Sequence, residues 1–210
     1  FADGFTLNDW KLGTWTNAAG ARYGEYEFFA DGSAQPQVSS SGSTSIPGTS
    51  DDLFFIGAGL SANTSFSPSR YFEGDIAEVI VYHYQLNATE RIITENYLAS
   101  RYHSAVTIAN DHFSYDASFG NDVAGIGRVG IDDFHTTAQS AGVLRVSNAA
   151  GLDDGEFLLF GHNGQDISSW STAGTPGENV QLLPRVWRFD ETGDIGTVVF
   201  RLDTTLLPAP

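Results

Sequence analysis

Residues 71–103 read YFEGDIAEVIVYHYQLNATERIITENYLASRYH, and the spacing of the apolar residues changes in the middle of this stretch. The first part, residues 71–86, has a long apolar run that is rich in β-branched and aromatic residues, which predicts a strand. The second part predicts a helix over about residues 87–102, because apolar side chains recur at i, i+4. Asn87 is a good N-cap, and Glu90 follows three residues later as in a capping box.

Short strand patterns lie on both sides of this stretch. Before it, the sequence predicts a strand over residues 23–29 and a tight turn at Asp31-Gly32. After it, five segments predict strands, with Gly, Asn and Asp breaks between them: 121–131, 142–150, 155–164, 182–191 and 195–203. We therefore expect an all-β protein with a partial antiparallel β-sandwich over residues 1–105, its helix at the junction, and a second small β-sandwich-like module over residues 111–207.

The charge of the chain restricts its partners. The 210 residues include 26 acidic and 10 basic ones, for a net charge of −16. This excess repels phosphate, so neither nucleic acid nor an anionic membrane surface is an expected partner. No stretch reaches the ~18–20 apolar residues that would insert in a bilayer. The absence of Cys, with few Lys and many Asn, Gly and Thr, indicates a bacterial extracellular or cell-surface protein.

Three acids in the opening stretch, Glu73, Asp75 and Glu78, raise the question of glycosidase chemistry. Such chemistry needs two carboxyl groups on either side of one bond. On a strand Glu73 and Asp75 share a face and Glu78 lies on the other, unless a β-bulge turns it round. We expect a structural role instead, in which Glu78 forms an ion pair with Arg91 or Arg101 of the following helix.

The first half of the chain resembles laminin-G-like, concanavalin-A-like domains of bacterial surface proteins. The matching segments are LFFIGAG and YFEGDIAEVIVYHYQL, followed by a predicted helix that contains Glu-Arg and Tyr-Leu-Ala. The resemblance implies the last strands and the terminal helix of a jelly-roll sandwich over about residues 1–103. The second half, with GNDVAGIGR, GLDDGEFLLFGHNG and RVWRFDETGDIGTV, resembles a β module that follows such domains in large secreted or cell-surface proteins.

A laminin-G-like sandwich is about twice as long as the matching part of this chain. Three explanations stay open: residues outside the given sequence, cleavage, or strands supplied by another copy, as in donor-strand assembly. The last would make the chain a subunit of an extracellular filament or surface assembly.

Two kinds of ligand site are expected from side-chain chemistry. Calcium takes oxygen ligands from loops, and the candidate ligands are five acids in turns: Asp153, Asp154, Asp190, Glu191 and Asp194. Exposed indole rings stack against sugars, and Trp10, Trp15 and Trp170 are the candidates for carbohydrate binding.

These observations favour a non-enzymatic surface or adhesion module that binds glycans, Ca²⁺, neighbouring domains or copies of itself. The assembly subunit is the alternative from another class. A polysaccharide hydrolase that uses Glu73 and Glu78 ranks third.

Overall fold

The computed structural model describes residues 9–16, 27–36, 56–57, 59–60, 68–69, 71–102, 108–177 and 179–209. Contacts divide the chain into two compact units. The first comprises residues 1–16, 27–38 and 86–210, and the second comprises residues 17–26 and 39–85. The predicted helix therefore belongs to the same unit as the β strands that follow it.

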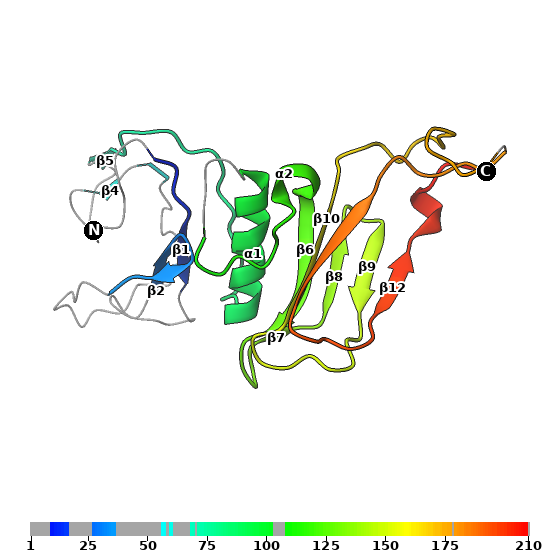
Figure 1. The fold of residues 1–210 in the computed structure, drawn as a ribbon. Helices are drawn as coiled ribbons and strands as arrows, with labels where there is room; N and C mark the ends of the chain where they lie inside the picture. The colour runs from blue at the N-terminus through cyan, green and yellow to red at the C-terminus, as the bar shows by residue number, and fades with distance from the viewer. Residues whose placement is uncertain are drawn as a thin grey trace. The chain divides into compact units, whose positions relative to one another are not determined.

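Most regular structure in the described residues is β, with one long helix (Figure 1). The helix α1 is Ala88–Arg101. The remaining elements in chain order are β1 Gly13–Thr16, β2 Glu27–Ala30, β3 Ser33–Ala34, β4 Gly59–Leu60, β5 Pro68–Ser69, α2 Asp116–Phe119, β6 Asn121–Arg128, β7 Phe134–His135, β8 Thr137–Ser140, β9 Leu144–Ser147, β10 Phe157–His162, β11 Trp187–Thr192, β12 Val199–Leu202 and the short 3-10 helix Thr204–Leu206. The predicted all-β class with a single long helix is confirmed.

The strands form antiparallel sheets in the orders β1-β2-β3, β11-β10-β6-β7 and β12-β9-β8, together with the pair β4-β5. The sheets that contain β6 and β9 pack over one core, built around Ile126, Val146, Leu158 and Phe160. Each of these four side chains is at most 5% exposed. Burial of this apolar area gives the unit a sandwich-like centre.

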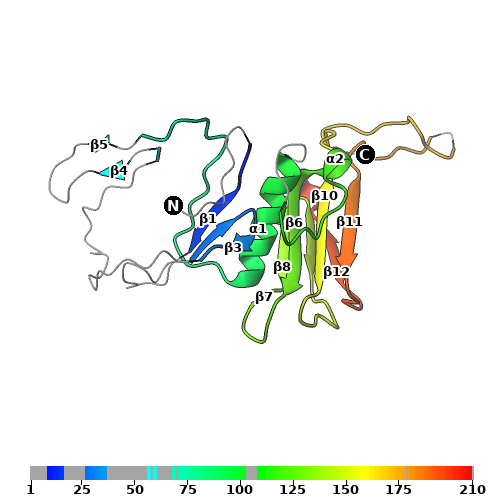
Figure 2. The ribbon, with the colours of Figure 1, turned by 60° about the vertical axis from the view of Figure 1, so that its left-hand side comes forward.

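Helix α1 covers the opposite face of the sheet that contains β6 and β10, so that sheet is buried on both sides (Figures 1 and 2). Ile92 of α1 packs there with Phe113, Val123, Phe157 and Leu159. All six residues of β10 are consequently buried. This explains why the sequence of β10 is a continuous apolar run rather than an alternating one.

Glycines in β6 make room for the large side chains of β10. A Cβ atom at Gly127 would lie 2.3 Å from the ring of Phe157, and one at Gly125 would lie 2.8 Å from Leu159. Real side chains do not approach that closely, so the Gly-Ile-Gly pattern of β6 fits the helix-facing rows of the two strands.

The N-terminal sheet β1-β2-β3 lies on the other side of α1 (Figure 2). Arg91 of α1 forms an ion pair with Glu95 one turn later, at 2.7 Å, and its guanidinium lies 3.8 Å from the centre of the Phe29 ring. Thr14 donates a hydrogen bond to Glu95 at 3.1 Å. Burial raises the pKa of Glu95, and Arg91 opposes that shift.

Several local predictions are confirmed. Asn87 caps α1, and both hydrogen bonds of the capping box with Glu90 are present. The turn at Asp31-Gly32 joins β2 to β3, with φ of 50° and 75° as the turn requires. Residues 23–26 of that predicted strand lie outside the described residues. Each of the five segments predicted after the helix contains a strand.

The strand predicted over residues 71–86 is wrong. Residues 71–87 have no regular secondary structure, although they include many exposed apolar side chains. The β-rich composition favours a strand only when another strand supplies hydrogen bonds and an apolar surface. No strand pairing involves these residues within the part of the chain that the structure describes.

Candidate functional site

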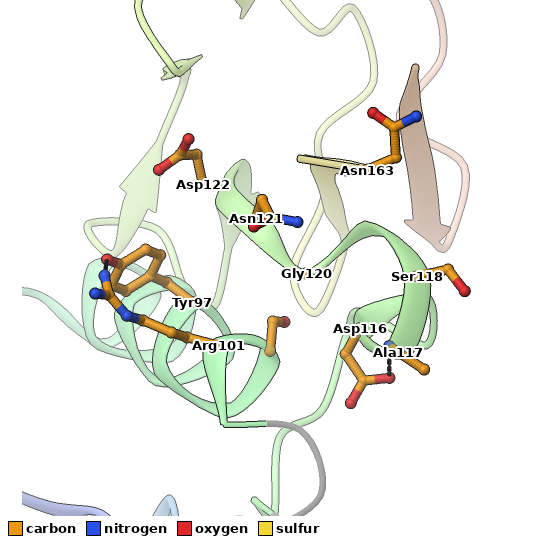
Figure 3. A pocket seen from close by; sticks show the side chains of 10 residues that line it. Tyr97, Arg101, Asp116, Ala117, Ser118, Gly120, Asn121, Asp122 and Asn163 are labelled. Carbon is orange, nitrogen blue, oxygen red and sulfur yellow. Dashed lines mark hydrogen bonds between the residues drawn. The ribbon is translucent and has the colours of Figure 1, made fainter. Parts of the chain in front are cut away.

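A polar pocket of about 550 Å³ lies beside the C-terminal end of α1, in the first compact unit (Figure 3). Ten residues line it: Tyr97, Ser100 and Arg101 of α1, Asp116, Ala117 and Ser118 of α2, Gly120, Asn121 and Asp122 at the start of β6, and Asn163 after β10. The volume lies in the ~300–1,000 Å³ range of small-molecule sites. Its lining differs from that of most such sites, because polar side chains predominate.

Two glycines let the backbone come together around the pocket. A Cβ atom at Gly120 would lie 2.6 Å from the carbonyl oxygen of Ser100 and 2.5 Å from that of Asp116. A Cβ atom at Gly161, in β10, would lie 2.2 Å from the carbonyl oxygen of Phe119. Glycine at these positions therefore allows α2 to pack tightly against the end of α1 and against β10.

A β-bulge in β6 presents Asp122 to the pocket. Phe160 pairs with Ala124, whereas His162 pairs with Asn121, so Asp122 and Val123 together oppose the single residue Gly161. Asp122 has a positive φ of 47°, the left-handed conformation that Asp tolerates better than most residues. The bulge turns the carboxylate of Asp122 toward the pocket while Val123 stays buried in the core beneath α1.

His162 holds this carboxylate from inside the protein. The residue is only 2% exposed, and its Nε2 lies 2.9 Å from Oδ2 of Asp122, whose side chain is 56% exposed. The backbone N–H of Gly164 donates to Nδ1 of His162 at 2.9 Å. Because Nδ1 accepts that bond, the ring proton is on Nε2 and donates to Asp122.

The charge state of His162 follows from the same surroundings. Burial lowers the pKa of His162, the hydrogen bond to Asp122 raises it, and Arg185 lowers it further. The net direction is downward, which favours the neutral ring with both nitrogens engaged. Neither nitrogen is left for proton transfer with a ligand, so the chemical role of His162 is to orient Asp122.

Other pocket side chains are anchored by neighbours. Asn121 donates through Nδ2 to the carbonyl oxygen of His162 at 3.0 Å. Asn163 Oδ1 accepts from the backbone N–H groups of Gln165 and Val186, and its Nδ2 donates to the carbonyl oxygen of Pro184. Arg101 donates to the hydroxyl of Tyr97 at 2.7 Å. The pocket thus combines acidic, amide, hydroxyl and guanidinium groups that are largely preorganised.

The five acids predicted to bind calcium take part in local hydrogen bonds and ion pairs. Asp154 lies 2.9 Å from Arg128, and Asp190 accepts from the backbone N–H and the hydroxyl of Ser114. In the turns around β11, Glu191 accepts from Ile195 and Asp194 accepts from Gly196.

Asp153 donates its backbone N–H to Glu156, which also accepts from the backbone N–H of Asp194; these two bonds lower the pKa of Glu156. Over residues 9–209, apart from the gaps given above, no three Asp, Glu, His or Cys side chains gather as metal ligands. Calcium binding by these acids therefore stays a prediction, and no cluster of ligands among the described residues marks a site for it.

The three tryptophans predicted to bind carbohydrate do not line the pocket. Trp10 and Trp15 are 45% and 60% exposed, and Trp15 stacks on Phe28 with ring centres 4.5 Å apart. Trp170 donates from its indole nitrogen to the carbonyl oxygens of Pro208 and Ala209. The structure does not bring these three side chains into the pocket beside α1.

The ion pair of Glu78 with Arg91 or Arg101 stays a prediction. Arg91 pairs with Glu95, as described above, and Arg101 bonds to Tyr97. Glu73 and Glu78, the residues of the hydrolase alternative, do not line the pocket either.

Sequence reasoning missed Asp122, His162, Asn121 and Asp116 as site residues. Asn-Asp directly after Gly120 is a turn signal at the start of a strand, and this is the one local feature that points to a bulge. These residues come together only in the fold, because His162 and Asp122 are 40 residues apart in the sequence.

One comparison with known proteins gives a match. A family model described as "Domain of unknown function (DUF8202)" matches residues 82–210, which include α1, every strand from β6 to β12 and all ten pocket residues. No curated protein and no solved structure matches the chain. The matched range begins just before α1, which agrees with the grouping of α1 and the later strands in one compact unit.

Proposed function

The chain belongs to this family of unknown function, and from that premise we propose that it is a non-catalytic binding module of an extracellular bacterial surface protein. Its ligand would be a neutral, hydroxyl-rich molecule such as an oligosaccharide, bound in the pocket beside α1. The observation that carries the proposal is the carboxylate of Asp122, held at the pocket by a buried His162 that has no nitrogen left for proton transfer.

The chemistry of the lining favours hydroxyl groups over ions. Asp116 and Asp122 accept hydrogen bonds, and carboxylates form stronger hydrogen bonds than neutral acceptors do. Two carboxylates in a chain of net charge −16 repel phosphate and other anions. A divalent cation is less suited, because no third acidic or imidazole side chain joins them among the described residues.

The surface location rests on composition. The chain has no Cys and an excess of acidic residues, as expected for an adhesion module outside the cell. None of the helices among the described residues is long and apolar enough to cross a bilayer.

The test is binding to a panel of immobilised neutral oligosaccharides, including α-glucans, β-glucans, mannans and galactans. The variant Asp122→Asn should weaken binding about tenfold or more, since hydrogen bonds to charged groups contribute about 1.5–3 kcal/mol. The matched control is Asp154→Asn, which makes the same chemical change at an exposed acid outside the pocket. Equal binding by the two variants, or no binding to any glycan by the unmodified protein, contradicts the proposal.

A further inference from the structure

Two arginines lie directly opposite each other on the outer face of the sheet β12-β9-β8. Arg201 of β12 pairs with Arg145 of the central strand β9, and both side chains are exposed (Figure 1). The neighbours of Arg145 along β9, Leu144 and Val146, are buried in the core between the two sheets. Because side chains alternate along a strand, both arginines lie on the face that is turned away from this core.

Neither arginine forms an ion pair within the part of the chain that the structure describes. Arg145 donates through Nε to the hydroxyl of Thr137 on β8, at 3.0 Å, and Arg201 makes no polar contact with a described residue. Asp203, the acid nearest to Arg201 in the sequence, accepts from the backbone N–H and the hydroxyl of Thr205. The terminal nitrogens of both guanidinium groups are therefore available to an acceptor from outside the chain.

An opposed pair of cations has an electrostatic cost for the folded protein. Residues directly opposite each other on antiparallel strands have Cβ atoms about 4.5–5.5 Å apart, and like charges in such positions are destabilising. Acidic residues outnumber basic ones by 26 to 10 in this chain, so the pair is not a consequence of a generally basic surface. An anion bound by both guanidinium groups would offset the repulsion and add charge-assisted hydrogen bonds.

We propose that Arg145 and Arg201 together bind the carboxylate of a uronic acid unit in a polysaccharide. Each guanidinium is a planar fork of N–H donors that matches the geometry of a carboxylate, so one carboxylate accepts from both arginines. Neutral polar side chains continue the same face: Ser147 follows Arg145 by two residues on β9, and Gln139 lies opposite Arg145 on β8. These hydroxyl and amide groups suit the hydroxyl groups of a sugar ring.

The net charge of the chain argues against occupants of other classes. At −16, the chain repels nucleic acid and other dense polyanions, and it repels a second copy of itself for the same reason. A carboxylate on a hydroxyl-rich ring meets less of this repulsion, because charges beyond the Debye length of about 8 Å are largely screened at physiological ionic strength. Extended peptides add to the exposed edge of a sheet, whereas this pair lies on a face.

The test is an NMR titration of the ¹⁵N-labelled full chain with digalacturonate, which follows the backbone amides of Arg145 and Arg201. The unmodified protein should give saturable shifts of these amides. Arg145→Gln and Arg201→Gln should each raise the Kd about tenfold or more, because each removes a hydrogen-bond donor that is charged. The methyl ester of the same disaccharide has no charge and should give no saturable shift.

The matched control is Arg188→Gln, which makes the same chemical change at an exposed arginine of β11, in the other sheet. This variant should bind digalacturonate like the unmodified protein. Thermal unfolding separates a binding role from a structural one. Arg201→Gln relieves the repulsion of Arg145, so it should unfold at a temperature no lower than the unmodified protein does.

Five results would overturn the proposal: no saturable shift with digalacturonate, equal binding of its methyl ester, an equal loss of affinity in Arg188→Gln, a lower unfolding temperature of Arg201→Gln, or tighter binding of a capped diglutamate peptide. The last result would mean that the two arginines take an acidic peptide. Neither arginine lines the pocket beside α1, so failure of this site and failure of the neutral-glycan site are separate outcomes.

Discussion

The imidazole of His162 is buried beneath Asp122 and donates to its carboxylate across 2.9 Å, while the Gly164 N–H donates to the other ring nitrogen. This is the reverse of a catalytic arrangement in which the imidazole faces the ligand and a buried carboxylate orients it. Here the carboxylate faces the pocket, and the histidine fixes its position. The relationship predicts both a pH dependence and a binding role.

Folding stability should decrease as the pH falls below about 6.5, the ordinary pKa of histidine. Burial lowers the pKa of His162 in the folded state, so the unfolded chain binds more protons in this range. The stabilisation is complete above pH 6.5 and is lost as the pH falls toward the lower folded value. Urea unfolding between pH 8 and pH 5 should show a shallower decline for His162→Gln than for the unmodified protein.

His112 offers a second contribution of the same sign. Burial lowers its pKa too, and its ring stacks on Phe157 with centres 4.1 Å apart. Gln at both positions should flatten the pH profile more than either substitution alone. An unchanged decline in the double variant would show that other groups cause the acid sensitivity.

The buried ion pair between Arg91 and Glu95 predicts a large cost when one partner is removed. Glu95 is 1% exposed and Arg91 is 8% exposed, so Glu95→Gln leaves a buried guanidinium without its counter-charge. We expect a loss of about 3–5 kcal/mol in the free energy of unfolding. Chemical denaturation measures it, with Asp154→Asn as the control for an exposed pair, expected to cost about 0–1 kcal/mol.

Replacement of both partners by apolar residues gives a sharper test of the same interaction. The double variant Arg91→Met, Glu95→Leu should be more stable than Glu95→Gln alone, because no unpaired charge remains in the interior. A double variant as unstable as the single one would show that the pair matters for its packing rather than for its charge.

Gly127 predicts a steric effect in the core. An Ala at this position would bring its Cβ atom to 2.3 Å from the Phe157 ring, which is fully packed beneath α1. Gly127→Ala should therefore lower the free energy of unfolding by about 1–3 kcal/mol. Gly130→Ala is the matched control, because its Cβ atom would meet nothing within 4 Å. Equal stability of the two variants would contradict the packing described for β6 and β10.

Local signals in the sequence predicted much of the second half of the fold. The capping box fixed the start of α1 at Asn87, and alternation with turn residues identified five strands from β6 to β12. The short elements β7, β8 and α2 were missed, since two to four residues carry too little periodicity to detect. The strand predicted over residues 71–86 is absent, because the composition suits a strand but does not reveal whether a partner strand is present.

The pocket could not be predicted from local patterns. It depends on a bulge at Asp122, on glycines that permit close backbone approach, and on a histidine from another strand. The tryptophans and the acidic turns were predicted as sites because indole rings stack on sugars and carboxylates bind calcium. In the structure the indole of Trp170 donates to the carbonyl oxygens of Pro208 and Ala209, and Asp190 accepts from the backbone N–H of Ser114.

The most direct test of the proposed function is an NMR titration of the ¹⁵N-labelled protein with a neutral oligosaccharide that binds on the panel. The account predicts saturable shifts of the backbone amides of Asn121, Asp122 and Gly164, and their loss in Asp122→Asn. Shifts that instead centre on Trp10 and Trp15, with the amides of the pocket unchanged, would contradict it.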